Sequence, residues 1–104
     1  MHGRYARYTY TGDVQELAQK AEAGILPIFQ AEPGFKGYSV LESDGEILSF
    51  SVWESAEAAE AANATAAEWM ATNIGDRMEL QETRIAEILF SSVFGLSTKA
   101  GASA

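Results

Sequence analysis

The sequence predicts an α+β fold with the element order βαββαβ, in which an antiparallel sheet carries two helices on one face. A hairpin turn at residues 43–46 leads into the alternating run 47–53 and then into an alanine-rich helix that contains Trp69. An amphipathic helix precedes this hairpin, and a tyrosine-rich strand precedes that helix. An apolar run after the second helix supplies the fourth strand.

The composition is that of one globular domain. The chain has 104 residues, and 47% of them are apolar, which is too many for a disordered segment. The 15 acidic and 7 basic residues leave a formal charge of −8. Because this charge repels phosphate backbones and anionic membranes, we expect no nucleic-acid partner and no membrane partner. A domain of this size buries only about two-thirds of its unfolded surface, so self-association would add useful burial.

Local signals mark the first strand and the first helix. Residues Arg4 to Tyr10 contain three tyrosines and predict a strand. Asp13 and Glu16 match a capping box at a helix start. The apolar residues that follow recur at steps of three and four and form one stripe: Val14, Leu17, Ala18, Ala21, Ile25, Ile28 and Phe29. Pro27 removes a backbone donor inside this pattern, so we expect a kink or break there.

The middle of the sequence predicts a turn and a hairpin. Pro33 and Gly34 suit the central positions of a type II turn, and Asp44-Gly45 between alternating runs predicts a type I′ hairpin. Alternation places Tyr38 and Val40 opposite Phe35 and Leu41 in the first hairpin strand, and places Leu48, Phe50 and Val52 together in the second. Neither face of the hairpin is cleanly polar. Since helices cover only one face, we expect something else to cover part of the other.

The second helix begins at Ser55, which is a suitable N-cap residue. Its inward positions are expected to be Ala59, Ala62, Ala66, Trp69, Met70 and Asn73. Gly75 is expected to end the helix, and residues Leu80 to Phe90 supply the last strand. The Gly, Ser and Ala content beyond Phe94 predicts a mobile tail.

The residue types that most familiar enzyme classes require are missing. His2 is the only histidine and lies beside the N-terminus, so a nucleophile paired with a histidine base is not expected. With no cysteine and a single histidine the sequence predicts no metal site, and it contains no glycine-rich phosphate loop. It also shows no apolar leader and no membrane-spanning run, so we expect a cytoplasmic protein without a cofactor.

A set of aromatic and polar residues remains that suits the lining of an apolar pocket. It consists of Tyr8, Tyr38, Trp53, Asn63, Trp69, Asn73 and Arg84. Each has a purely structural alternative. Trp53, which ends a strand before a helix, is favoured as a core residue, whereas Trp69 suits a core position and a cavity wall equally. The tyrosines are favoured as cross-strand packing pairs.

The polar candidates differ in what they can reach. Trp69 and Asn73 are four residues apart on one helix and can touch, whereas Asn63 is too far round the helix to contact Trp69. An inward Asn73 would need partners for its amide, and a capping role at the helix end is favoured instead. Arg84 is favoured to pair with a carboxylate, the alternative being a planar donor to an anionic substrate group.

The chain resembles the dimeric α/β-barrel superfamily, and most of all its antibiotic-biosynthesis-monooxygenase-like domains. The resemblance rests on the Pro27 segment leading into Glu32-Pro33-Gly34-Phe35-Lys36-Gly37-Tyr38, and on Val52-Trp53-Glu54-Ser55 followed by the alanine-rich run to Trp69-Met70. It covers nearly the whole chain. It implies a ferredoxin-like domain over residues 1–94, with a tail at 95–104, whose sheet packs face to face with that of a second copy to form a homodimeric barrel.

The resemblance also implies a pocket between the sheet and the helices. Some family members oxidise phenolic or quinol-like rings with oxygen and without flavin or metal. By this resemblance Trp69, Asn73 and Arg84 are expected to be catalytic, and Tyr8, Tyr38, Trp53 and Asn63 are expected to contact the substrate. Haem-degrading relatives need a histidine on the second helix, and residues 56–74 contain none.

Three hypotheses about function follow. The first is a cofactor-independent monooxygenase that acts on an aromatic or quinol-like molecule. The second is a non-enzymatic ligand-binding or structural dimerisation module, which tight packing around both tryptophans would favour. The third is an RNA-recognition domain, which shares the strand order but requires a basic lead-in and a positive charge that this chain lacks.

Overall fold

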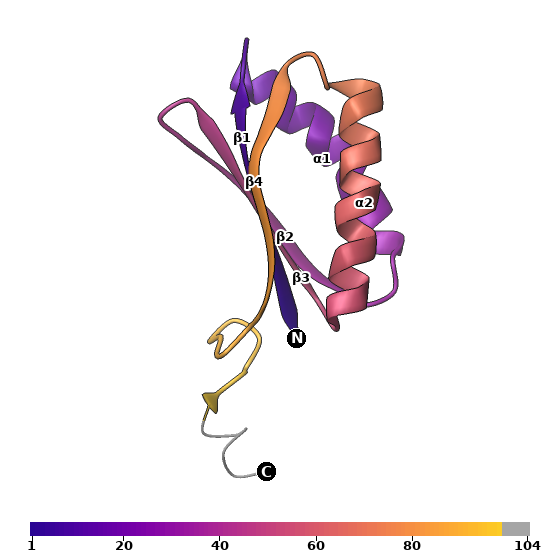
Figure 1. The fold of residues 1–104 in the computed structure, drawn as a ribbon, viewed down its shortest axis with the longest axis vertical. Coiled ribbons are helices and arrows are strands. Elements are labelled where there is room, and N and C mark those ends of the chain that lie inside the picture. The colour runs from indigo at the N-terminus through magenta and orange to yellow at the C-terminus, as the bar shows by residue number, and fades with distance from the viewer. Residues whose placement is uncertain (99–104) are drawn as a thin grey trace.

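Two helices cover one face of a four-stranded antiparallel sheet in the computed structural model, which describes residues 1–98 (Figure 1). The elements are β1 (His2–Tyr10), α1 (Val14–Ala31), β2 (Phe35–Ser43), β3 (Glu46–Trp53), α2 (Ala56–Asn73) and β4 (Met78–Glu87). The strands are ordered β2-β3-β1-β4, and each neighbouring pair is antiparallel. This is the ferredoxin-like βαββαβ arrangement that the sequence predicts.

Side chains cap both helices where the sequence predicts them. The Asp13 carboxylate accepts a hydrogen bond of 2.9 Å from the amide of Gln15, and the Ser55 hydroxyl accepts one of 3.1 Å from the amide of Ala58. Each bond satisfies an amide that the first helical turn leaves free. Glu16 does not complete the predicted capping box; its carboxylate lies 2.9 Å from the Arg77 guanidinium instead.

The two predicted turns are also present. Gly34 has a φ of 86°, and the amide of Phe35 donates to the carbonyl of Glu32, as a type II turn requires. Asp44 and Gly45 have φ values of 51° and 80°, which is the paired left-handed geometry of a type I′ hairpin.

The expected break at Pro27 does not occur, since α1 is one continuous helix from Val14 to Ala31. The proline leaves the carbonyl of Ala23 without its usual helical donor. On either side of it, however, Ile25 and Phe29 are buried in the core. Burying these two side chains is worth about 1.5–3 kcal/mol each, which is enough to hold the helix together across the missing bond.

A β-bulge changes the predicted face of Phe35. The pairing of β2 with β3 shifts between Phe35 and Gly37, so that Phe35 lies opposite Trp53 and Tyr38 lies opposite Ser51. Phe35 therefore points to the helices together with Tyr38, not away from it as strict alternation predicts. Its ring packs edge-on against Trp53, with 5.4 Å between the ring centroids.

The core beneath the helices consists of two clusters. One is centred on Trp53 and Phe29 with the buried alanines of α2, and the other contains Ala6, Tyr8, Leu17, Ile47 and Ile74. Trp69 is half-buried and packs against both clusters. The side chain of Trp69 therefore lies at the junction of the two halves of the core.

The other face of the sheet carries no helix (Figure 1). Strand alternation directs Tyr5, Leu41 and Phe50 to this side, and the side chains of Leu41 and Phe50 are 47% and 44% exposed. The rings of Tyr5 and Phe50 contact each other, with 5.1 Å between their centroids. We call this surface the open sheet face. Its partly exposed apolar residues agree with the sequence-based expectation that neither face of the hairpin is polar.

After β4 the chain passes the end of the sheet and returns to β2: the amide of Ile88 donates to the carbonyl of Met1 at 3.0 Å, and the ring of Phe94 lies beside Gly37. β4 ends at Glu87, before the Phe90 that the sequence predicts, and the exposed side chains of Leu89, Phe90 and Val93 follow. A short bridge joins Ser91 to Leu96. The tail expected at residues 95–104 lies largely outside the described residues, which end at 98. Within the described part, no helix is both long enough and apolar enough to cross a membrane.

Candidate functional site

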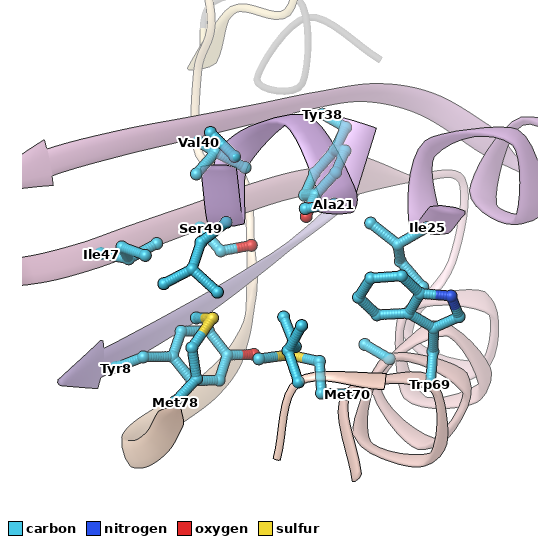
Figure 2. A pocket seen from close by; sticks show the side chains of 14 residues that line it. Tyr8, Ala21, Ile25, Tyr38, Val40, Ile47, Ser49, Trp69, Met70 and Met78 are labelled. Atoms are coloured by element: carbon cyan, nitrogen blue, oxygen red, sulfur yellow. The ribbon is translucent and has the colours of Figure 1, made fainter. Parts of the chain in front are cut away.

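A small internal cavity lies between the sheet and the two helices, at the gap between the two core clusters (Figure 2). Its volume is about 30 Å³. Leu17, Ala18, Ala21 and Ile25 line it from α1; Ala66, Trp69 and Met70 line it from α2; and Tyr8, Tyr38, Val40, Ile47 and Ser49 line it from the sheet. The helices thus contribute only apolar or aromatic walls, and the hydroxyl groups come from the strands.

Three hydroxyl groups gather on the sheet side of the cavity. Tyr8 projects from β1, Ser49 from β3 and Tyr38 from β2, and Figure 2 shows their oxygens directed into the same space. The strand register explains the gap between the tyrosines. Ala6 lies directly opposite Ser49, so that small side chains occupy the row between the rows of the two tyrosines, and Ser49 lines the cavity there. The sheet therefore offers a polar floor to an otherwise apolar space.

Arg4 lies on the same helix-covered face of β1 as Ala6 and Tyr8, and is only 2% exposed. Its Nη2 donates to the hydroxyl oxygen of Tyr8 at 3.3 Å, and its Nε donates to Oδ1 of Asn63 at 2.8 Å. Among residues 1–98, no carboxylate lies within the 4.0 Å of an ion pair to Arg4. Arginine keeps its charge in proteins, so a cation without a counter-charge is buried next to the cavity.

Burial raises the pKa of the Tyr38 hydroxyl above its ordinary value of 10.0, while an interaction with the Ser49 hydroxyl and the charge of Arg4 act in the opposite direction. Desolvation disfavours the charged phenolate, which is why burial has this sign. Tyr38 therefore keeps its proton at neutral pH. It is a hydrogen-bond donor to the cavity, not a general base.

Trp69 forms the side wall of the cavity, and Gly24 of α1 makes its position possible. A Cβ atom at residue 24 would lie less than 3.0 Å from three ring atoms of the Trp69 indole. Only glycine leaves space at this point of the helix, although it costs about 0.5–1 kcal/mol relative to alanine there. The indole also lines the outer surface near Asn73, so it separates the cavity from solvent between α1 and α2.

An outer groove of about 450 Å³ runs between α1 and the edge strand β2. Four residues line both spaces: Ala18, Ala21, Tyr38 and Val40. These four form a neck that joins the groove to the cavity. Tyr8 and Ser49 line the inner cavity alone. The route from solvent therefore passes the two alanines first and ends at the hydroxyl groups.

The structure brings three of the sequence-predicted site residues together at the cavity: Tyr8, Tyr38 and Trp69. Trp53 is fully buried in the core, where its Nε1 donates to the Ser51 hydroxyl at 2.9 Å. Asn63 contacts Arg4 and not the cavity, and it also accepts a 3.2 Å hydrogen bond from the Thr83 hydroxyl.

The other two predicted site residues lie away from the cavity. Asn73 is exposed, not inward as the helical pattern predicts, and its side-chain amide donates to the carbonyl of Trp69, one turn earlier in α2, at 2.8 Å. Arg84 lies opposite Tyr5 on the open sheet face, where its side chain is 74% exposed and pairs with Glu82 at 2.7 Å. Arg84 thus makes the carboxylate pair that was its favoured alternative, whereas Asn73 bonds within its own helix and the cap position is held by Ile74.

Sequence reasoning missed Arg4, Ser49 and Met70. Arg4 stands in a run of exposed-looking polar and tyrosine residues, and only strand alternation with Ala6 and Tyr8 would have placed it under the helices. Ser49 alternates with Ile47 in the same way. Among residues 1–98, no group of three or more His, Cys, Asp or Glu side chains is placed to hold a metal ion.

The fold and its cavity define a ferredoxin-like α+β domain whose interior space opens between a helix and an edge strand. The sequence profile of the antibiotic biosynthesis monooxygenase family matches residues 5–68, and the chain belongs to this family. The match covers most of β1, all of α1, β2 and β3, and α2 as far as Glu68; the cavity residues Trp69, Met70, Ile74 and Met78 lie beyond it. No functionally curated protein gives a significant match.

Solved structures share the fold. SnoaB from Streptomyces nogalater, described as a cofactor-independent oxygenase, superposes with a TM-score of 0.70 at 20% identity, over 88% of this chain and 95% of SnoaB. Rv0793 from Mycobacterium tuberculosis has a TM-score of 0.67 at 18% identity, over 88% and 97% of the two chains. MupZ from Pseudomonas fluorescens has a TM-score of 0.68 at 12% identity, over 81% and 69%.

Proposed function

We propose that this protein is a cofactor-independent monooxygenase that oxidises a flat phenolic or quinol-like ring. The observation that supports this best is the cavity itself, whose apolar walls end at the hydroxyl groups of Tyr8, Tyr38 and Ser49. Apolar walls suit a ring, and hydroxyl groups suit its oxygen substituent. Membership of the monooxygenase family and the fold shared with an oxygenase support the same conclusion.

The sizes of the two spaces determine how such a ring would lie. A water-sized group needs about 10–15 Å³, so the inner cavity of about 30 Å³ has room for an oxygen substituent and one further small group, but not for a ring. The ring itself would occupy the neck between Ala18 and Ala21 on one side and Tyr38 and Val40 on the other. The flexible side chain of Met70 and the indole of Trp69 would move to admit the ring more deeply.

The proposed reaction needs no external reductant, because the ring supplies all four electrons that reduce oxygen. A phenol with a hydrogen at the para carbon loses that hydrogen and its hydroxyl hydrogen, and both leave in water with one oxygen atom. The second oxygen atom becomes the new carbonyl of a quinone. The protein would hold the ring oxygen at the hydroxyl groups and shield the ring from water with Trp69 and the helices.

Oxygen consumption with 1-naphthol tests this proposal. The purified protein is expected to consume one oxygen molecule for each 1,4-naphthoquinone formed. Tyr38→Phe removes a donor at the cavity and is expected to lower kcat/KM by about tenfold, the usual cost of about 1–2 kcal/mol for such a hydrogen bond. Tyr10→Phe is the matched control, since that hydroxyl contacts Glu42 at the surface and should leave the rate unchanged.

A rate equal to that of buffer alone, with this phenol and with hydroquinones of similar size, would contradict the proposal. It would favour the second hypothesis, a ligand-binding or structural module. One observation favours that hypothesis already: Trp53 is tightly packed, with 5.3 Å between its ring centroid and that of Phe29. Trp69 does not share this packing, because it borders open space on both of its sides.

We also propose that two copies pair through the open sheet face to form the family's barrel. Leu41 and Phe50 are too exposed for a face that meets only water, and they lie beside Leu48 and Val52 on adjacent positions of the hairpin. A second sheet packed here would bury them at the usual spacing of about 10 Å between sheets. The homodimer would also compensate for the small core of a short chain.

A further inference from the structure

The cation of Arg4 has no counter-charge, and this suggests what the cavity binds. The side chain is 2% exposed and uses its donors on two neutral oxygens, those of Asn63 and Tyr8. Moving a charge from water into a protein is strongly unfavourable when no opposite charge accompanies it. A fold that retains such a charge beside a cavity is better suited to an anionic occupant than to a neutral one.

The hydrogen bond from Arg4 to Tyr8 links the buried positive charge to the cavity. A guanidinium can only donate, so the Tyr8 oxygen accepts from Nη2 of Arg4 and keeps its own proton free to donate. The Tyr8 hydroxyl points into the cavity (Figure 2). Accepting a charge-assisted bond polarises that hydroxyl and makes it a stronger donor. The positive charge of Arg4 would therefore strengthen the hydrogen bond from the Tyr8 hydroxyl to a ligand oxygen in the cavity.

Among the described residues, no carboxylate lines the cavity; Glu42, which lies opposite the cavity residue Ile47, accepts a hydrogen bond from the Tyr10 hydroxyl instead. The cavity walls contributed by α1 and α2 are apolar or aromatic, and the titratable side chains that line it are Tyr8 and Tyr38. Both hydroxyl groups act as hydrogen-bond donors when protonated. Burial raises the pKa of Tyr38 above its ordinary value, so its hydroxyl is protonated at neutral pH. Among the described residues that line either the cavity or the outer groove, Glu22 is the only carboxylate, and it lines the groove alone.

We propose that Arg4 is a positioning residue that, acting through Tyr8, makes the cavity bind its phenolic ligand as the phenolate. The ligand oxyanion would accept hydrogen bonds from Tyr8 and Tyr38, with Ser49 beside them, and would supply the counter-charge that Arg4 lacks. This inference rests on the proposed function for its substrate class. It adds a specific consequence, since an ionised phenol gives up an electron to oxygen more readily than a neutral one.

The ionisation state of a bound chromophoric phenol tests the proposal without any turnover. The probe is 4-nitrophenol, because its phenolate absorbs visible light and its neutral form does not. Titration of the 104-residue protein with this probe over a range of pH gives the pKa of the bound probe. We expect binding to lower that pKa by about one unit or more, as a nearby opposite charge does.

Three variants that each change the net charge by −1 separate the role of Arg4 from a general charge effect. Arg4→Gln retains a side-chain donor for Asn63 but removes the charge, and is expected to abolish the pKa shift. Asn63→Asp would give Arg4 a carboxylate at the 2.8 Å position of the present amide oxygen, and is expected to abolish the shift while preserving the fold. Lys36→Gln changes a surface charge paired with Glu54, and should leave the shift intact.

Two further measurements distinguish a loss of the Arg4 charge from a loss of folding. Arg4→Lys keeps the charge and is expected to restore part of the shift, which a purely structural role would not require. The circular dichroism of every variant is compared with that of the wild type, and the Asn63→Asp result decides the matter if Arg4→Gln does not fold.

Each outcome bears on the proposal. Binding of the neutral phenol, or a full shift in Asn63→Asp, would overturn it and leave the oxygenase proposal standing. Phenolate binding without oxygen consumption by any phenol would support it and contradict the oxygenase proposal. A protein that binds no phenol at all at millimolar concentration would overturn both, because the cavity would then be part of a closed core.

Discussion

The hydroxyl group of Tyr38 occupies the point where the outer groove meets the inner cavity. Its ring packs edge-on against Phe29, with 5.0 Å between the centroids, so that the core fixes its direction. Burial raises the pKa of this hydroxyl above 10.0, because the phenolate would lose its hydration. Tyr38 therefore packs in the core and lines the cavity, and its ionisation affects the stability of the protein at high pH.

This raised pKa predicts how stability depends on pH. Between the unfolded value near 10.0 and the higher folded value, the folded state holds the Tyr38 proton and the unfolded state does not. The contribution of Tyr38 is thus fully present below the unfolded pKa, and is lost as pH rises toward the folded pKa. We expect the free energy of unfolding to fall over this alkaline range, and to fall less steeply in Tyr38→Phe.

Urea unfolding at a series of alkaline pH values measures this slope. Tyr10→Phe removes a tyrosine outside the cavity whose pKa is also raised, chiefly by a hydrogen bond to Glu42, so it shows how much of the slope arises away from Tyr38. A wild-type slope equal to that of Tyr38→Phe would show that Tyr38 is solvated in the folded protein, and would argue against its place at the neck of the cavity.

At the scale of elements, α1 and α2 pack closely where Gly24 of α1 faces the indole ring of Trp69 in α2. Gly24 of α1 leaves the space that the Trp69 indole of α2 occupies. Gly24→Ala would normally stabilise a helix by about 0.5–1 kcal/mol. Here we expect the reverse, a loss of about 1–3 kcal/mol in the free energy of unfolding, because the new methyl group overlaps the indole.

Chemical denaturation checks this expectation, with Ala67→Gly as the control for helix propensity. Ala67 is exposed on α2, so its replacement by glycine should cost about 1 kcal/mol and nothing more. Combining Gly24→Ala with Trp69→Leu should recover part of the lost stability, since the smaller side chain removes the overlap. A Gly24→Ala variant more stable than the wild type would show that Trp69 packs elsewhere in solution.

The elements themselves were predictable because each depends on neighbours in the sequence. The caps at Asp13 and Ser55 and the turn at Asp44-Gly45 are local hydrogen-bond and φ requirements, and all three are confirmed. The errors arose where tertiary contacts override a local rule. α1 continues past Pro27 because Ile25 and Phe29 are packed in the core. Phe35 lies against Trp53 because a β-bulge shifts the register of β2.

At the scale of the whole molecule, the site was less predictable than the fold, because its members meet only through sheet register. Arg4 and Asn63 are 59 positions apart in the sequence, and no local pattern relates them. The aromatic content did single out Tyr8, Tyr38 and Trp69 correctly as residues that share a space. Arg84 was singled out wrongly. Successive residues of β4 alternate between the helix-covered face and the open sheet face, and Arg84 lies on the open face opposite Tyr5.

The open sheet face yields a prediction about assembly. Phe50→Lys places a charge at the centre of the proposed dimer interface, and we expect it to weaken association by at least about tenfold in sedimentation experiments. Ile28→Lys is the matched control, because Ile28 is an exposed apolar residue on the helix side. Equal sedimentation of wild type, Phe50→Lys and Ile28→Lys as monomers would contradict the proposed barrel.

The contrasting surroundings of the two tryptophans give the chain a built-in optical reporter. Trp53 is sealed in the core and Trp69 borders the cavity, so the indole fluorescence of Trp53 should respond to unfolding and that of Trp69 to an arriving ring as well. A Trp69→Phe protein would retain only the first signal. Unlabelled compounds could therefore be screened for occupancy of the cavity by quenching alone, before any reaction is known.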